Sequence, residues 1–128
     1  MILADTSVWV EHLRGRNPER GSSTEMEQRL GAGQIAMHPF IVAEIALGSL
    51  HNRRKRLEEM EALLEVKVAQ LGVVRHMIDA HALYSKGIGL TDAHLIASCL
   101  LTPGIQLWTR DTALQRVAKD LGVLADLP

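Results

Sequence analysis

Short apolar runs alternate with longer stretches of helical periodicity along this chain. The runs predict short buried strands at residues 2–4, 34–37 and 105–109, with residues 123–124 as a further edge strand. The stretches between them predict helices over residues 7–14, 39–50, 53–69, 73–85, 91–101 and 111–121. Buried strands separated by helices in this order indicate an α/β fold built on a parallel sheet.

One further helix is predicted from its capping signals. Two overlapping boxes of the S/T-x-x-E type begin at Ser22 and Thr24, and the helix that they open ends at Gly31 or Gly33. Residues 14–23, which contain Gly, Pro, Asn and Ser, are predicted to form the loop that leads into it.

Four acidic residues occupy positions that the apolar pattern does not explain. Asp5 directly follows the first predicted strand, and Asp111 lies just past the third. Glu44 and Asp92 are each the only formally charged residue of an apolar helical segment. Because ligands of such sheets bind beyond the carboxyl ends of the strands, Asp5 and Asp111 are expected at one rim.

Taken singly, each acid has a simpler interpretation. The three aspartates stand where helix N-caps are expected, and both interpretations remain open for each of them. Glu44 lies about one and a half turns inside its helix, too far from the start to cap it. Its simpler interpretation is a buried salt bridge to an arginine.

Taken together, the four acids indicate a cation site. Carboxylates that share a partly buried site repel one another, and raised pKa values or a bound divalent cation relieve that repulsion. All-oxygen ligands favour Mg²⁺, with Mn²⁺ as the alternative, over zinc, and the six histidines show no zinc-binding spacing. Such an ion suits phosphate chemistry, because it polarises the phosphoryl oxygen and activates a bound water.

Composition narrows the choice of partners and compartment. With 14 basic and 15 acidic residues the net charge is −1, and aromatic residues make up 3%, so neither a global basic field nor an aromatic stacking platform indicates nucleic-acid binding. The lone cysteine, Cys99, is expected to be a buried thiol in a reducing cytoplasm. The sequence shows neither a signal peptide nor an apolar run long enough for a membrane span, so no membrane contact is expected.

Four stretches carry the acids in a recognisable order: DTSVWVEHLR, HPFIVAEIALGSL, GIGLTDAHLIAS and LWTRDTALQRVA. Through them the chain resembles the PIN-domain ribonucleases over nearly its whole length, and specifically the VapC toxins of bacterial toxin–antitoxin pairs. The resemblance implies that residues 1–128 form a single PIN-like nuclease domain. The implied fold is a three-layer α/β/α arrangement with a central parallel sheet of short strands.

The resemblance also implies a function, which is the Mg²⁺-dependent hydrolysis of RNA phosphodiester bonds. Asp5 and Asp92 would be the main metal ligands, partly through water. Asp111 would complete the cluster, and Glu44 would hold a second ion or orient the attacking water. All four are thereby implied to be catalytic and metal-binding. The implied supporting residues are Thr6, Ser7 and Thr109.

Three kinds of partner follow from the resemblance: an RNA substrate, a cognate antitoxin that packs into the active-site groove, and a second copy of the chain in a homodimer. Candidate phosphate contacts are basic residues near the expected site. A solvated helix face is the alternative for the run HNRRKR, and a salt bridge to a neighbouring acid is the alternative for Arg110. The candidates are Arg14, Arg53, Arg54, Arg56, Lys86 and Arg110, with Arg16 and Arg20 in the predicted loop.

Two other classes of function remain open. A catalytically silent module would bind RNA or a partner through the same cation pocket. A small-molecule phosphatase of the haloacid-dehalogenase type also places an aspartate after its first strand. Its second acid stands two positions further on, where this chain has Ser7.

Overall fold

The computed structural model describes residues 1–15 and 21–128, with side chains in the second range from residue 24 onward. Within these ranges four strands form one parallel sheet in the order β3-β2-β1-β4. The strands are β1 (Ile2–Ala4), β2 (Ile35–Met37), β3 (Leu64–Glu65) and β4 (Gln106–Trp108). The helices are α1 (Thr6–Leu13), α2 (Gly21–Gly31), α3 (Pro39–Leu47), α4 (Arg53–Glu61), α5 (Leu71–Ala80), α6 (Leu90–Leu101) and α7 (Thr112–Asp120).

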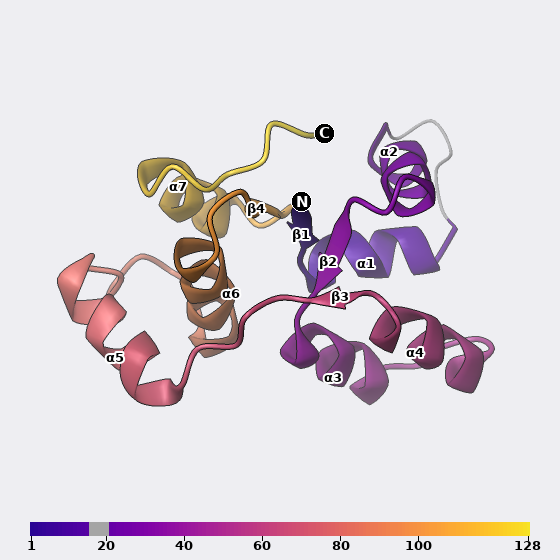
Figure 1. The fold of residues 1–128 in the computed structure, drawn as a ribbon, viewed down its shortest axis with the longest axis horizontal. Helices are drawn as coiled ribbons and strands as arrows, with labels where there is room; N and C mark the ends of the chain where they lie inside the picture. The colour runs from indigo at the N-terminus through magenta and orange to yellow at the C-terminus, as the bar shows by residue number, and fades with distance from the viewer. Residues whose placement is uncertain (16–20) are drawn as a thin grey trace.

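Right-handed crossovers divide the helices between the two faces of the sheet. The connections from β1 to β2 and from β2 to β3 advance across the sheet in one direction, whereas the connection from β3 to β4 returns. Because such connections are right-handed, the first four helices cover one face, and α5 and α6 cover the other. Figure 1 shows this division, with α7 on the side of α5 and α6. The predicted three-layer α/β/α fold with a short-stranded parallel sheet is therefore confirmed.

The core is centred on β1, which has a partner strand on each side. Leu3 pairs with Ala36 of β2 and with Leu107 of β4, and all three side chains are fully buried. A strand covered on both faces has no polar side, which explains the uninterrupted apolar runs in the sequence. The carboxyl end of β1 is thus held in place by two neighbours.

The single cysteine of the chain lies in the core. Cys99 on α6 is a buried free cysteine, as expected, and burial raises the pKa of its thiol to about 12. None of the helices described is both long enough and apolar enough to cross a bilayer.

The predicted helix over residues 53–69 is wrong in its second half. α4 ends early, and the chain then adds β3 to the edge of the sheet, where Leu64 pairs with Ala36. The Val66 amide extends this pairing by donating to the Met37 carbonyl at 2.9 Å. Leu64 and Val68, two of the apolar residues whose helical spacing suggested one long helix, stay exposed at 63% and 39%. Pairing with β2, and not burial of these side chains, therefore determines the structure here.

Other element boundaries differ from the prediction by a few residues. α3 ends before residue 50, and α5 runs over Leu71–Ala80 rather than 73–85. The backbone has a positive φ at Ala82 and Ser85, which is incompatible with a continuing helix. At the far edge, the predicted strand over residues 123–124 is reduced to one isolated parallel bridge with β4.

The capping boxes do not mark the start of α2. Its described part begins at Gly21, so Ser22 and Thr24 lie inside the helix, which ends at Gly31 as predicted. Residues 21–23 therefore belong to this helix rather than to the predicted loop. The middle of that loop, residues 16–20 with Arg16 and Arg20, lies outside the described residues.

Two buried histidines lie between α3 and α6. His38 caps α3, because its Nδ1 accepts a hydrogen bond from the Phe40 amide at 3.0 Å. The His38 and His94 ring centroids are 6.3 Å apart, and the Phe40 ring lies 4.5 Å from that of His94. Burial, with a smaller contribution from His94, lowers the pKa of His38 to about 4, and burial also lowers the pKa of His94. Both rings are therefore neutral at pH 7.

The core assignment predicts that the Leu3→Ala variant loses about 2–5 kcal/mol in its free energy of unfolding, because a fully buried side chain leaves a cavity in the central strand. Leu71→Ala, at 62% exposure at the start of α5, is the matched control and should change that free energy by less than about 0.5 kcal/mol. Urea denaturation measures both values. Equal losses in the two variants would contradict this description of the core.

Relative to the His38→Asn variant, the parent protein should lose stability as the pH falls from about 6.5 to 4, because the unfolded chain takes up a proton on His38 that the folded chain does not. A folded-state pKa of about 4 corresponds to a loss of about 3 kcal/mol. His38→Asn keeps a capping acceptor and does not titrate, so the difference between the two proteins separates the contribution of His38 from those of Asp5, Asp92 and His94, whose pKa values are also shifted. Urea denaturation at a series of pH values tests this expectation, and parallel curves for the two proteins would refute it.

Candidate active site

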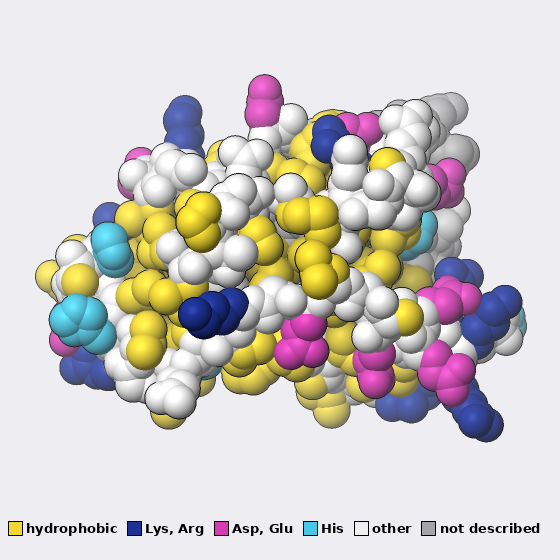
Figure 2. Space-filling model, viewed as in Figure 1, with side chains coloured by type: hydrophobic (Ala, Val, Ile, Leu, Met, Phe, Trp, Pro, Cys, Tyr) yellow, Lys and Arg dark blue, Asp and Glu magenta, His cyan; other side chains and the backbone are white. Residues whose placement is uncertain are grey.

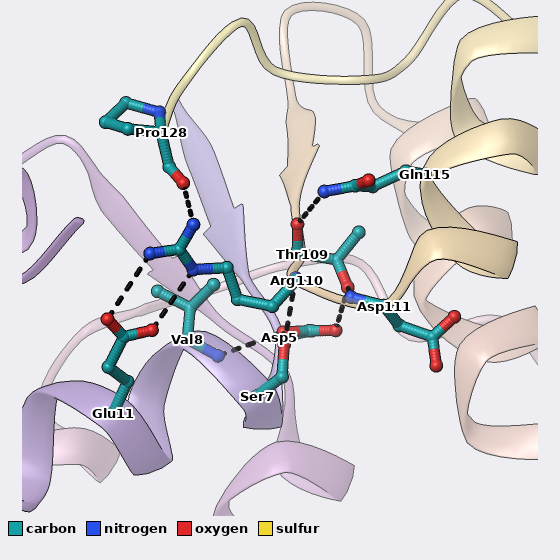
Figure 3. A network of polar contacts seen from close by, with 9 residues as sticks. All are labelled: Asp5, Ser7, Val8, Glu11, Thr109, Arg110, Asp111, Gln115 and Pro128. Atoms are coloured by element: carbon teal, nitrogen blue, oxygen red, sulfur yellow. Dashed lines mark hydrogen bonds and ion pairs between the residues drawn. The ribbon is translucent and has the colours of Figure 1, made fainter. Parts of the chain in front are cut away.

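Asp5 is a buried carboxylate at the junction of β1 and α1. It is 5% exposed and caps α1 by accepting a hydrogen bond from the Val8 amide at 3.2 Å. The Ser7 hydroxyl donates to one carboxylate oxygen and the Thr109 hydroxyl donates to the other (Figure 3). The fold thus brings residues from opposite ends of the chain into contact with Asp5.

The main chain sets the direction of these hydrogen bonds. The Arg110 amide donates to the Ser7 oxygen at 3.0 Å, and the Asp111 amide donates to the Thr109 oxygen, also at 3.0 Å. Because an amide N–H can only donate, each hydroxyl directs its single proton toward Asp5. Both oxygens of Asp5 accept, and this arrangement favours the ionised carboxylate.

Two opposing effects act on the pKa of Asp5. Burial raises the pKa and is the larger effect, while the hydrogen bonds from Ser7, Thr109 and Val8 lower it. The pKa therefore stays above the ordinary value for an aspartate. A cation bound beside Asp5 would favour its charged form and so offset the effect of burial.

Asp111 lies at the start of α7, on the turn that follows β4. Its exposed side chain caps the helix through a 2.9 Å hydrogen bond from the Leu114 amide. Gln115 supports the same turn by donating to the Thr109 carbonyl at 2.8 Å. In Figure 3 the Asp111 carboxylate points away from the Arg110 guanidinium, so the turn presents an acid on one side and a cation on the other.

Asp92 connects the other three acids electrostatically. It is half-buried near the start of α6, where its carboxylate accepts a 3.2 Å hydrogen bond from the Gly89 amide. Burial is the main cause of its raised pKa, and the charges of Asp111, Asp5 and Glu44 raise it further. The other three acids therefore lie near enough for their charges to act on Asp92, at the end of the sheet where β1 and β4 terminate.

Glu44 lies on the exposed side of α3, contrary to the buried position that its apolar neighbours suggested. Its carboxylate accepts a 2.6 Å hydrogen bond from the hydroxyl of Thr6, the first residue of α1. Ala43 and Leu47 are exposed as well, so this side of the helix is an apolar surface. Within residues 1–15 and 21–128 no ion pair to Glu44 is present, and the salt-bridge interpretation is not supported there.

The capping interpretation and the cation-site interpretation are compatible. Asp5 and Asp111 are N-caps, and Asp92 accepts from the amide that precedes α6. In the part of the chain that the structure describes, no three histidine, cysteine, aspartate or glutamate side chains are arranged to hold a metal ion. The acids thus surround one region without forming a closed set of direct ligands.

A groove of about 370 Å³ opens beside Glu44, between α1 and the segment that follows α3. Most of its walls are apolar, and Arg14 and His51 add positive or titratable groups. The lining residues are Val10, Leu13, Arg14, Glu44, Ile45, Gly48, Ser49, Leu50 and His51. Arg14 is therefore the candidate phosphate contact that shares a groove with one of the four acids.

The remaining basic candidates have varied surroundings. Arg53 donates to the Ala46 carbonyl at 2.8 Å, across the connection from α3 to α4. Arg54 pairs with Glu58 at 3.2 Å on a highly exposed helix face, which agrees with the solvated-face alternative. The half-buried Arg56 lines a separate pocket of about 220 Å³.

Lys86 and Arg110 are the two basic candidates on segments next to the start of α7. Lys86 is exposed on the loop before α6, where the adjoining Gly87 closely approaches Ala113 of α7. Arg110 forms an ion pair with Glu11 at 3.1 Å, as its salt-bridge alternative expected. Glu11 was not identified from the sequence, because its partner is 99 positions away and no local pattern connects them.

Comparison with known proteins supports the same family as the sequence motifs. The PIN domain model matches residues 2–120. Two relatives from Mycobacterium tuberculosis, of strains CDC 1551 / Oshkosh and ATCC 25618 / H37Rv, both bear the name Ribonuclease VapC32. Each is 35% identical over 123 residues, which cover 96% of this chain and 94% of the relative. The chain therefore belongs to the PIN-domain family and, within it, to the VapC ribonucleases.

Proposed function

We propose that this protein is a Mg²⁺-dependent endoribonuclease that acts as the toxin of a toxin–antitoxin pair. The observation that carries the proposal is the convergence of four acids on one region, seen in the effect of three of them on the pKa of Asp92. Clustered carboxylates are the usual protein ligands of Mg²⁺ in phosphate chemistry. Similarity to proteins named ribonuclease supports RNA as the substrate.

The four acids would divide the work of holding the ion. Asp5, Asp92 and Asp111 would hold Mg²⁺, with Mn²⁺ as the alternative, and Glu44 would hold a second ion or orient the attacking water. When bound, the ion polarises the phosphoryl oxygen and lowers the pKa of a bound water. Mg²⁺ usually keeps several waters and takes one or two carboxylates, which suits acids that are not arranged as direct ligands.

The chain's own contribution is to keep the acids charged and correctly aimed. The hydroxyls of Ser7 and Thr109 donate to Asp5 and oppose the effect of burial on its pKa. The Thr6 hydroxyl holds the carboxylate of Glu44 near the start of α1. Arg14 in the adjoining groove is placed to attract an RNA phosphate, and Lys86 lies near α7 with the same charge.

Two apolar surfaces suit the partners of a toxin in the cytoplasm. The groove beside Glu44 has mainly apolar walls, which fit the tail of an antitoxin. Figure 2 shows hydrophobic side chains across the face that carries β3 and the segment after it. Leu64 and Val68 are exposed there, at 63% and 39%, and this face fits a second copy of the chain in a homodimer.

The Asp92→Asn variant should cut RNA about 100-fold more slowly or worse, because it removes a metal ligand while keeping the acceptor for the Gly89 amide. Its melting temperature should stay equal or rise: the folded state raises the pKa of Asp92, so ionised Asp92 opposes folding at pH 7. Asp79→Asn, on the exposed surface of α5, is the control.

Cleavage by the parent protein should stop on addition of EDTA and return with Mg²⁺. Two further substrates separate the alternatives. Turnover of a chromogenic phosphate monoester without RNA cleavage would favour a phosphatase. RNA binding without any cleavage, equal in the parent and in Asp92→Asn, would favour a catalytically silent module and would refute the proposal.

The Thr109→Val variant should move the acid limb of the pH–rate profile to higher pH. The hydrogen bond from Thr109 lowers the pKa of Asp5, so its loss lets burial raise that pKa further, and a higher pH is then needed to ionise Asp5. Thr102→Val, at the other end of α6 from Asp92, is the matched control. An unchanged acid limb in Thr109→Val would show that ionisation of Asp5 does not limit the rate.

A further inference from the structure

Arg110 contacts α1 at two points, one turn apart. Its amide donates to the Ser7 hydroxyl oxygen at 3.0 Å. Its guanidinium pairs with Glu11 through two hydrogen bonds, from Nε to Oε2 at 3.1 Å and from Nη2 to Oε1 at 3.3 Å. Ser7 and Glu11 are four residues apart and so lie on the same side of α1. One residue of the turn between β4 and α7 is thereby fixed to one side of this helix.

The two contacts of Arg110 with α1 lie next to the hydrogen bonds that Asp5 accepts. The residues on either side of Arg110 are Thr109, which donates to Asp5, and Asp111, whose amide orients the Thr109 hydroxyl. A shift of the turn relative to α1 would therefore lengthen two hydrogen bonds at once, the one from Thr109 to Asp5 and the one from the Arg110 amide that orients the Ser7 hydroxyl.

We infer that the Glu11–Arg110 ion pair is a positioning device that fixes the turn of residues 109–111 against α1 and so keeps Asp5 and Asp111 in their working geometry. The inference rests on the proposed function in treating these aspartates as the active site. Glu11 and Arg110 are positioning residues in this account, because they act through Ser7 and Thr109.

The surroundings of the pair favour this role over a direct phosphate contact. The Glu11 side chain is 15% exposed and that of Arg110 is 33% exposed, whereas the Arg75–Asp79 pair on α5 is exposed at 66% and 64%. Arg110 also donates through Nη1 to the Pro128 carbonyl, on the side away from the Asp111 carboxylate (Figure 3). Turning Arg110 toward RNA would break both its ion pair with Glu11 and its hydrogen bond to the Pro128 carbonyl.

The first test does not depend on RNA. Amide hydrogen exchange at Arg110 and Asp111 is measured by NMR in Glu11→Gln and Arg110→Gln, with Asp79→Asn as the control that breaks an exposed pair. Exchange should accelerate about tenfold or more in both test variants and stay unchanged in the control. If a glutamine variant unfolds, Arg110→Lys or Glu11→Asp, which retains the charge, is measured in its place. Unchanged exchange in folded test variants would overturn the inference, whether or not the protein cuts RNA.

The second test separates positioning from phosphate contact. With RNA as substrate, Glu11→Gln and Arg110→Gln should each lower kcat by about 10- to 100-fold with little change in KM. The double variant should be no worse than either single one, because both remove the same interaction. A direct contact between Arg110 and an RNA phosphate predicts a different pattern. Arg110→Gln would then raise KM and weaken the dependence of KM on salt, while Glu11→Gln would lower KM.

That pattern would overturn the inference. A parent protein that cuts no RNA would refute the proposed function and leave the exchange result to decide the inference.

Discussion

The pairing of β1 with β4 is the constraint on which the site depends. It aligns Ala4 with Trp108, and the Asp5 amide continues the ladder by donating to the Trp108 carbonyl at 2.9 Å. The residues after the two strands must then meet, although about a hundred positions separate them in the chain. The contact between Asp5 and Thr109 follows directly, and so does the hydrogen bond from the Arg110 amide to Ser7 of α1. The strand pairing that builds the core therefore also determines the position of Asp5 in the site.

That arrangement places the carboxylates of Asp5 and Asp92 where folding raises their pKa values. Burial raises the pKa of Asp5, and burial with three neighbouring acids raises the pKa of Asp92. Folding at neutral pH thus proceeds against the ionisation of both residues, and the free energy comes from the apolar core on each side of the sheet. A site that stores electrostatic repulsion in this way gains most from a cation, because binding relieves the repulsion.

Much of this could be predicted from local sequence, and the remainder could not for identifiable reasons. The strand before Asp5 and the strand before Thr109 are buried on both faces, so their apolar runs are unambiguous. β3 was missed because Leu64 belongs to a stripe with helical spacing, while its actual partner lies on β2. Such long-range pairing leaves no mark in a local window.

The same distinction applies to the acids and their supports. Asp5, Asp92 and Asp111 stand at helix starts, a position that sequence can locate, and their shared region follows from parallel topology. Glu44 was located correctly in its helix, but its exposure was misjudged, because an apolar surface and a buried face look alike in sequence. Glu11 gave no signal, since an ordinary glutamate on a helix acquires significance only from a distant arginine.

The orientation of the Ser7 and Thr109 hydroxyls has a consequence for proton transfer to Asp5. A hydroxyl can relay a proton only if its oxygen receives one from a group able to release it. The oxygens of Ser7 and Thr109 instead accept from main-chain amides, which do not titrate in this range. These two amide hydrogen bonds therefore bring Asp5 no proton that titrates near neutral pH. Ser7 and Thr109 thus act on Asp5 as oriented hydrogen-bond donors, which stabilise its charge without exchanging a proton with the amides behind them.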